Sequence, residues 1–179
     1  PCFRAVRNTP RKQARRAIDK AEVADRVAKV ASLSPVADAA TREAALTLAR
    51  RSVALGKGDR LLPWYQMDLG LAEYRSGNFA AAIEAMTVAV QTVSALSDSE
   101  KERNYINGFV GFYRAMSLYR QGMQEEARDL FLATESAMVP FPADEKNPLA
   151  EGADHDDLIL WLACKEAGAL LGVPGAPGK

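Results

Sequence analysis

Apolar residues recur every three or four positions along most of the chain, and proline, glycine or a polar cluster interrupts the pattern at intervals. This spacing is that of one face of an α-helix, and its continuity predicts an all-α fold with no sheet. The predicted helices cover approximately residues 20–33, 38–55, 63–75, 79–96, 97–121, 127–138 and 154–171. A loop with three prolines, residues 139–153, separates the last two.

The first two predicted helices form a pair. The first carries an apolar face made of Val23, Val27, Val30 and Leu33, widened by Ala24, Ala28 and Ala31. It ends at Ser34, because the residue before a proline avoids the α region. The second has Ala45, Leu48, Ala49, Ser52 and Val53 at helical spacing and stops at Gly56. We interpret it as the second half of a helical hairpin.

The stretch 64–90 contains two apolar helical patterns joined by a turn at Gly77. Glycine takes the positive φ that ends a helix without steric cost. Gly70 and Ala82 fall where the two helices would cross, and their small size lets the backbones approach. Large residues fill the space around that crossing, namely Tyr74, Phe79 and Met86.

The next helix begins with a capping-box pattern at Ser97-Asp98-Ser99-Glu100 and continues to about Gln121. It carries many large apolar residues, namely Tyr105, Phe109, Phe112, Tyr113, Met116 and Tyr119. Gly122 ends it, as Gly77 ends the earlier helix. A partner helix follows, marked by Ala127, Leu130, Phe131 and Met138.

Small residues at a helix crossing, large ones around it and a tight turn between them resemble a tetratricopeptide repeat (TPR) hairpin. The matching residues are Leu69, Gly70, Tyr74, Gly77, Phe79, Ala82 and Ala89, with Tyr74 one place later than the usual aromatic. The spacing from Gly77 to Gly122 exceeds the ~34 residues of a minimal repeat, and Arg114 and Thr134 depart from the motif. The resemblance implies a right-handed superhelix of about three antiparallel hairpins plus a C-terminal capping helix, over residues 19–172.

Most of residues 20–172 resembles the C-terminal TPR region of certain bacterial serine/threonine protein kinases. The matching segments are residues 24–35, 45–56, 62–86, 119–131 and 154–171. The phosphate-binding loop and catalytic motifs of a kinase domain are not among these 179 residues. The resemblance therefore implies an accessory module without catalysis of its own, in a parent protein that is a kinase.

Composition narrows the possible partners. Lys and Arg together number 23, as do Asp and Glu, so net charge gives no reason to expect nucleic acid. Two distant cysteines suit a reducing, cytoplasmic compartment. We expect no membrane span and no signal peptide, and the oligomeric state stays open. Residues 1–18 are basic and are interpreted as a linker or extension of a longer protein, and residues 173–179 as a disordered tail.

Few residues suggest chemistry. The cluster Asp154-His155-Asp156-Asp157 is the only metal-like group, and at most two of its side chains are expected to reach one ion. An acidic helix N-terminus, stabilised by the helix dipole, explains it better. We therefore predict no metal and no cofactor. Cys164 falls on an apolar helix face and is interpreted as a buried thiol.

In a TPR array the first helix of each hairpin lines a concave groove. The resemblance assigns that groove to Trp64, Met67, Leu71, Tyr74, Arg75, Phe109, Phe112, Met116, Tyr119 and Arg120. Aromatic and methionine side chains suit a peptide or protein segment, or another domain of the same polypeptide. Alternatively these residues are core, covered by the final helix.

Three functions follow from these features. The first is a protein-interaction module, scaffold or regulatory. The second is an architectural spacer whose groove is filled by its own capping helix. An enzyme is a remote third, because these residues assemble no convergent polar pocket.

Overall fold

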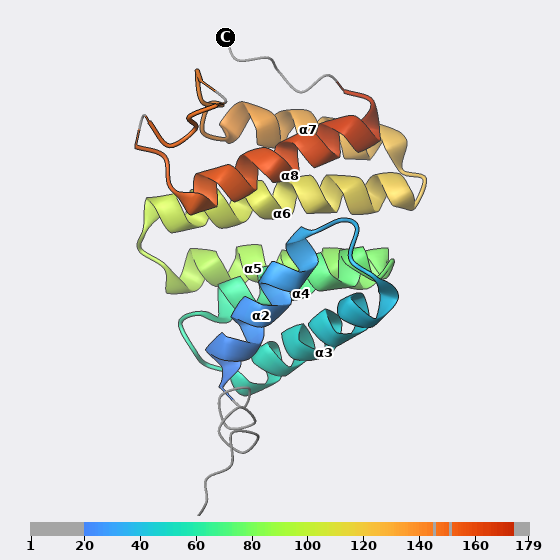
Figure 1. The fold of residues 1–179 in the computed structure, drawn as a ribbon, viewed down its shortest axis with the longest axis vertical. Coiled ribbons are helices and arrows are strands. Elements are labelled where there is room, and N and C mark those ends of the chain that lie inside the picture. The colour runs from blue at the N-terminus through green and yellow to red at the C-terminus, as the bar shows by residue number, and fades with distance from the viewer. Residues whose placement is uncertain (1–19, 145, 151, 174–179) are drawn as a thin grey trace, which may run out of the picture.

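The computed structural model describes residues 20–144, 146–150 and 152–173, and the described residues form seven helices and no strand (Figure 1). The helices are α2 (Ala21–Leu33), α3 (Ala39–Leu55), α4 (Leu62–Arg75), α5 (Phe79–Leu96), α6 (Glu100–Arg120), α7 (Gln124–Ala137) and α8 (His155–Leu171). The all-α prediction is confirmed. The predicted extension at 1–18 and the tail beyond residue 173 lie outside the described residues.

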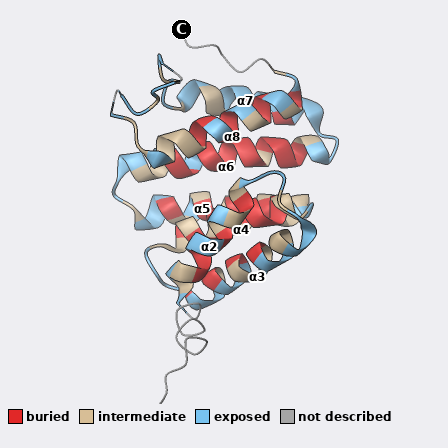
Figure 2. Ribbon diagram, in the orientation of Figure 1, coloured by how far each residue is buried: buried red, intermediate tan, exposed pale blue. Residues whose placement is uncertain are grey.

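The helices pack largely in sequential pairs, α2 with α3, α4 with α5 and α6 with α7 (Figure 1). The first helices of successive pairs also contact one another, α2 with α4 and α4 with α6, and α6 contacts α8 in the same way. Each second helix contacts the helix that follows it. The core therefore extends from pair to pair, and α6 has the longest run of buried residues (Figure 2).

The two turns predicted at glycine are confirmed. Gly77 has φ 80° and Gly122 has φ 87°, and each follows the end of the first helix of a pair. The residue after each glycine donates its backbone N–H to the carbonyl five residues earlier, at 2.9 Å after Gly77 and 3.0 Å after Gly122. Both turns are the hydrogen-bonded helix ending for which glycine is preferred.

The crossing of α4 and α5 is as close as the small residues suggested. A Cβ atom placed on Gly70 would lie 2.5 Å from Cγ of Met86 and 3.3 Å from the carbonyl oxygen of Ala82. Neither separation leaves room for a side chain. The φ of Gly70 is ordinary for a helix, so its backbone conformation does not require glycine. The close packing against α5 does.

The start of α6 differs from the prediction. The N-cap is Ser99, whose hydroxyl accepts the backbone N–H of Glu102 at 3.2 Å, so the capping residue lies two places beyond Ser97. Ser97 instead ends α5, its N–H bound to the carbonyl of Val93 at 3.0 Å. Because Ser97 still belongs to the end of α5, the N-cap of α6 falls two residues later, at Ser99.

The buried face of α2 was predicted only in part. Val27 and Val30 are 49% and 72% exposed, whereas Ala24, Ala28 and Ser32 are buried. The valines and the buried residues are neighbours in sequence and lie about 100° apart around the helix. The small residues face α3 and α4 because they allow those helices to approach closely.

By length and composition alone, α5 could cross a membrane, contrary to the expectation that no stretch would qualify. The core helix of a soluble protein passes the same test but is mostly buried, whereas 28% of this stretch is buried here. Here α5 packs against α4 and α6 and buries Ala82, Met86 and Ala89.

Candidate functional site

Six of the ten predicted groove residues are buried in the core. They are Met67, Leu71, Phe109, Phe112 and Met116, all 0% exposed, and Tyr74 at 7%. The core cluster that contains them includes Leu160, Cys164 and Ala167 of α8. These side chains have almost no surface to offer a partner: those on α6 lie in the helix that α8 packs against, and those on α4 lie among α2, α5 and α6.

The other four groove residues have different environments. Trp64 is partly exposed near the start of α4. Tyr119 is partly buried and Arg120 is exposed at the far end of α6. Arg75 joins four helices. The structure therefore does not gather the ten residues on one open surface.

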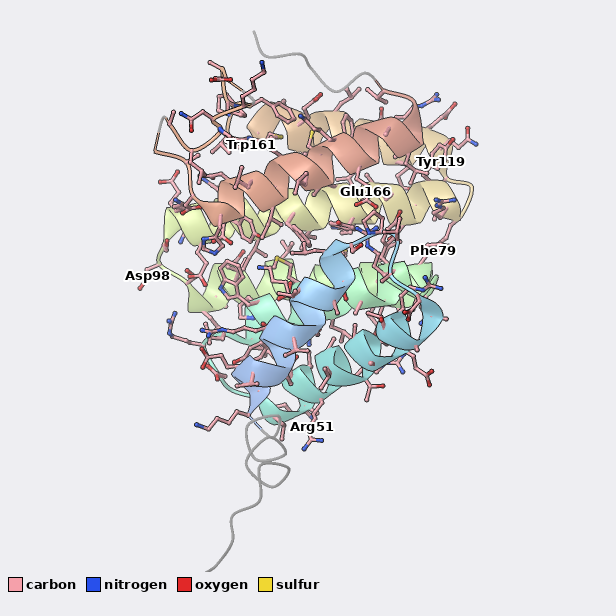
Figure 3. The ribbon with its side chains drawn as sticks, in the orientation of Figure 1. Arg51, Phe79, Asp98, Tyr119, Trp161 and Glu166 are labelled. Carbon is pink, nitrogen blue, oxygen red and sulfur yellow. The ribbon has the colours of Figure 1, made fainter. Side chains whose placement is uncertain are left out.

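Arg75, at the end of α4, forms a cluster with α2, α6 and α8. Its Nε donates to the carbonyl oxygen of Ser32 at 2.8 Å, and its Nη2 donates to the Tyr113 hydroxyl at 3.0 Å and to Oε2 of Glu166 at 2.7 Å. Its Nη1 is also paired with Glu166. Figure 3 labels Glu166 on α8, near the end of α2. Burial, the largest single effect, would lower the pKa of Arg75, but the hydrogen bond to Glu166 and the charge interactions with Tyr113, Glu166 and Tyr74 together raise that pKa.

An aromatic row connects the Arg75 cluster to Trp64. Tyr105, Phe109 and Tyr113 follow one another at i, i+4 along α6, with ring centroids 6.1 and 4.7 Å apart. Trp64 stacks on Tyr105 at 5.2 Å. Aromatic pairs at these distances contribute beyond the area they bury. The row holds Trp64 in place near the start of α4.

Trp64 borders a pocket of about 670 Å³, here called the Trp64 pocket, where α4, α6, the end of α7 and the start of α8 meet. Its apolar walls are Trp64, Tyr105, Leu160, Met138 and Val139. Val139 is 42% exposed, and its carbonyl oxygen accepts the indole N–H of Trp161 at 3.3 Å. This pocket is large enough for one or two side chains of a partner.

The rim of the Trp64 pocket is polar. Lys101 Nζ lies 2.7 Å from Oδ2 of Asp154, which joins α6 to the start of α8. Their hydrogen bond raises the pKa of Lys101 and lowers the pKa of Asp154. The Trp64 indole N–H donates to Glu102, which also accepts the Ser97 hydroxyl at 2.5 Å. An apolar floor with hydrogen-bonding groups around it is typical of a ligand or peptide site.

A second pocket of about 370 Å³, here called the Asp68 pocket, lies between α2, α4 and α8 and shares Trp64 with the first. Asp25 and Asp68 line it at 7% and 1% exposure. When both carboxylates are ionised, neither oxygen of Asp68 receives a hydrogen bond. When the pair holds one proton, a hydrogen bond forms between the side chains of Asp25 and Asp68. Burial raises the pKa of Asp25 to about 6 and the pKa of Asp68 well above its ordinary range.

Asp68→Asn is expected to stabilise the protein near neutral pH. Because the folded pKa values are raised, the stability that this pair contributes is present below the ordinary pKa of 3.8 and is lost as pH rises through about 6. The amide variant does not ionise, so it should gain about 2 kcal/mol over the wild type at about pH 8 and little at about pH 4. Urea unfolding across this range measures the difference. Parallel pH profiles for the two proteins would contradict the expectation.

The acidic cluster at the start of α8 caps that helix. The Asp154 carboxylate accepts the backbone N–H groups of Asp156 and Asp157, and the Asp157 carboxylate accepts that of Asp154 at 3.0 Å. Because Asp154 folds back over the first turn, one ligand atom from each of Asp154, His155 and Asp156 lies within 4.8 Å of the others. The expectation that at most two could converge was therefore wrong. Cys164 is fully buried, as predicted, and burial raises the pKa of its thiol to about 12.

Sequence reasoning missed Asp25, Asp68 and the walls supplied by α7 and α8. One signal was available for the carboxyl pair. Asp25 precedes Ala28 by three residues and Ser32 by seven, so it shares the small-residue stripe of α2 that faces the core. Nothing local in residues 138–160 indicates that Met138, Val139 and Leu160 meet Trp64, because that contact depends on how α8 crosses the stack.

Comparison with models of known protein families, with curated proteins and with solved structures found no match. What is shown is an all-helical protein whose described residues form seven helices packed largely in sequential pairs, and no family is assigned.

Proposed function

We propose that the chain is a TPR-like helical-repeat module that binds a protein or peptide segment at the Trp64 pocket. The packing supports this, because first helices contact first helices and each second helix contacts the next pair. The equivalent turns at Gly77 and Gly122 also support it, since repeats reuse the same local geometry.

The single observation that carries the proposal is the Trp64 pocket itself. A partly exposed tryptophan is held by stacking on Tyr105, beside apolar Met138 and Val139 and a polar rim from Lys101. Interfaces concentrate their binding energy in such central apolar pockets surrounded by polar groups. The partner chemistry that fits is a large apolar or aromatic side chain flanked by hydrogen-bonding backbone.

Membership of a larger bacterial signalling protein, such as a serine/threonine kinase, and a cytoplasmic location complete the proposal. The sequence resemblance alone supports the first, and cysteine usage supports the second. Within such a protein the module would act as a scaffold or regulatory region. Its partner would then be a separate protein or another domain of the same polypeptide.

The pocket predicts which substitutions weaken binding. Peptides selected from a displayed random library against the wild-type chain should lose affinity by about 1–3 kcal/mol on Trp64→Ala. Val139→Asp, which adds a charge to a partly exposed wall, should weaken the same peptides without removing core volume. Arg128→Ala on the exposed side of α7 is the matched control and should change nothing. Calorimetric titration, with melting curves for each variant, measures these effects.

Two results would count against this site: no enriched peptide, or peptides that bind Val139→Asp and Arg128→Ala equally well.

The burial of six predicted groove residues favours a second candidate, the architectural spacer. In that case α8 fills the groove and the chain holds other parts of its protein at a set distance. Tyr74→Ala and Phe112→Ala would then lower the melting temperature, and no peptide would be selected at the Trp64 pocket.

A further inference from the structure

The Asp68 pocket concentrates negative charge in an apolar setting. Four carboxyl groups line it, from Glu22, Asp25, Asp68 and Asp156, against two basic side chains, Arg26 and Lys29. Its other walls are largely apolar, with Leu33, Leu61 and Ile159 among them. Burying a carboxylate away from water is costly unless a proton or a cation accompanies it.

The two basic side chains attract the carboxyl groups of Asp25 and Asp68, since the charge of Lys29 acts on both and that of Arg26 acts on Asp25, but burial outweighs them and both side chains also make other contacts. Arg26 pairs with Glu22 at 2.5 Å on the exposed side of α2. The Lys29 ammonium lies over the rings of Trp64 and Tyr105, 5.1 and 5.5 Å from their centroids. In the described part of the chain, both oxygens of Asp68 and Oδ1 of Asp25 are buried without a hydrogen-bond partner.

We propose that the Asp68 pocket binds an organic cation, a primary alkylammonium or guanidinium group, with Asp25 and Asp68 as its receptors. Such a cation carries several N–H donors, which match the unpartnered carboxylate oxygens. Its carbon chain would contact Ile159 and Leu61, which line the same pocket as Trp64. The position of Lys29 shows that this end of the molecule already accommodates an ammonium group against the same ring.

The apolar walls favour an organic cation over a hard metal ion. Calcium takes six to eight oxygen ligands and magnesium demands six in octahedral array. The Asp68 pocket offers two buried carboxyl groups together with leucine, isoleucine and tryptophan side chains. An alkyl chain gains from those walls, whereas a hydrated ion does not.

Binding at this pocket is expected to depend on pH. The cation pairs with ionised carboxylates, so it must displace the proton that the Asp25–Asp68 pair holds near neutral pH. Glu22, Arg26 and Lys29 face the pair from α2, and His155 and Asp156 face it from α8. Affinity should therefore rise with pH.

The test is calorimetric titration of the folded chain with n-butylammonium and with ethylguanidinium. At about pH 8 either should bind saturably, and at about pH 5 at least about tenfold more weakly. Asp68→Asn should weaken binding by a similar factor at the higher pH. Glu84→Gln, which removes an exposed carboxylate on α5, is the matched control and should bind as the wild type does. Proton release, measured in buffers of different ionisation enthalpy, should accompany binding.

Absence of saturable binding of both probes at the higher pH, or equal affinity of Asp68→Asn and wild type, would overturn the proposal. If Asp68→Asn fails to fold, Asp25→Asn carries the same comparison. A blocked lysine peptide that binds more tightly than n-butylammonium identifies the cation as a side chain of a polypeptide, and equal affinities identify a free amine. The Val139→Asp variant should bind both probes unchanged, which separates this pocket from the Trp64 pocket.

Discussion

Arg75→Ala is expected to lower the free energy of unfolding by about 3 kcal/mol, because breaking a buried ion pair from one side costs about 3–5 kcal/mol. The Arg75 side chain is 6% exposed, and Glu166 is 28% exposed. The substitution removes the donors to Glu166, to the Tyr113 hydroxyl and to the Ser32 carbonyl together. Four helices lose their common contact, and the Glu166 carboxylate loses its pairing cation.

Chemical denaturation measures this loss. Arg75→Lys should recover only part of the stability, since an ammonium cannot reproduce the forked geometry of the guanidinium. Arg26→Ala, which breaks an exposed i, i+4 pair with Glu22, is the control and should change stability by no more than about 0.5 kcal/mol. Equal effects of Arg75→Ala and Arg26→Ala would show that the Arg75 cluster does not tie the helices together.

Gly70→Leu is expected to destabilise the fold by about 3 kcal/mol or more through overpacking. The first added carbon would already lie 2.5 Å from Cγ of Met86, and the Ala82 carbonyl at 3.3 Å prevents a simple shift of α4. Ala82→Leu should act in the same direction, because Ala82 is fully buried at the same crossing.

Ala95→Leu supplies the matched control for Ala82→Leu, because it makes the same substitution at an exposed position of α5. Its melting temperature should stay near that of the wild type, while Gly70→Leu and Ala82→Leu melt well below it. A Gly70→Leu protein that melts with the wild type would mean that α4 and α5 do not cross there.

The features that local sequence determines were predicted well. Gly77 and Gly122 end helices because glycine alone takes their φ without strain, and that requirement involves only adjacent residues. The Gly70–Ala82 contact was also predictable, since a short turn restricts where the two helices of a hairpin can cross. Helix bounds therefore differ from prediction by only a few residues.

Which face of a helix remains exposed to solvent could not be predicted from local sequence. Phe109 and Phe112 were assigned to a groove, yet both are fully buried because α8 lies along α6. The face of α2 was predicted only in part for a related reason, since Ala24 and Ala28 are buried as expected whereas Val27 and Val30 are exposed. Both outcomes depend on contacts between segments that are distant in sequence, and the periodicity of apolar residues carries no information about those contacts.

The candidate site was predictable only in part. Trp64 was assigned to the partner-binding groove by the TPR resemblance, and it also borders the Trp64 pocket. The partners that make it a pocket, Met138 and Val139, come from a different segment. Asp68 was passed over because a lone aspartate among apolar residues in sequence gives no sign that a second carboxyl group lies beside it.

Fluorescence of Trp64 tests the proposed interaction function most directly. The chain has two tryptophans, so a Trp161→Phe variant reports Trp64 alone. Titration with a peptide selected on the wild-type chain should shift or quench the Trp64 emission saturably, with the dissociation constant that calorimetry gives. Saturable calorimetric binding of that peptide with unchanged Trp64 emission would contradict the assignment of the partner site to the Trp64 pocket.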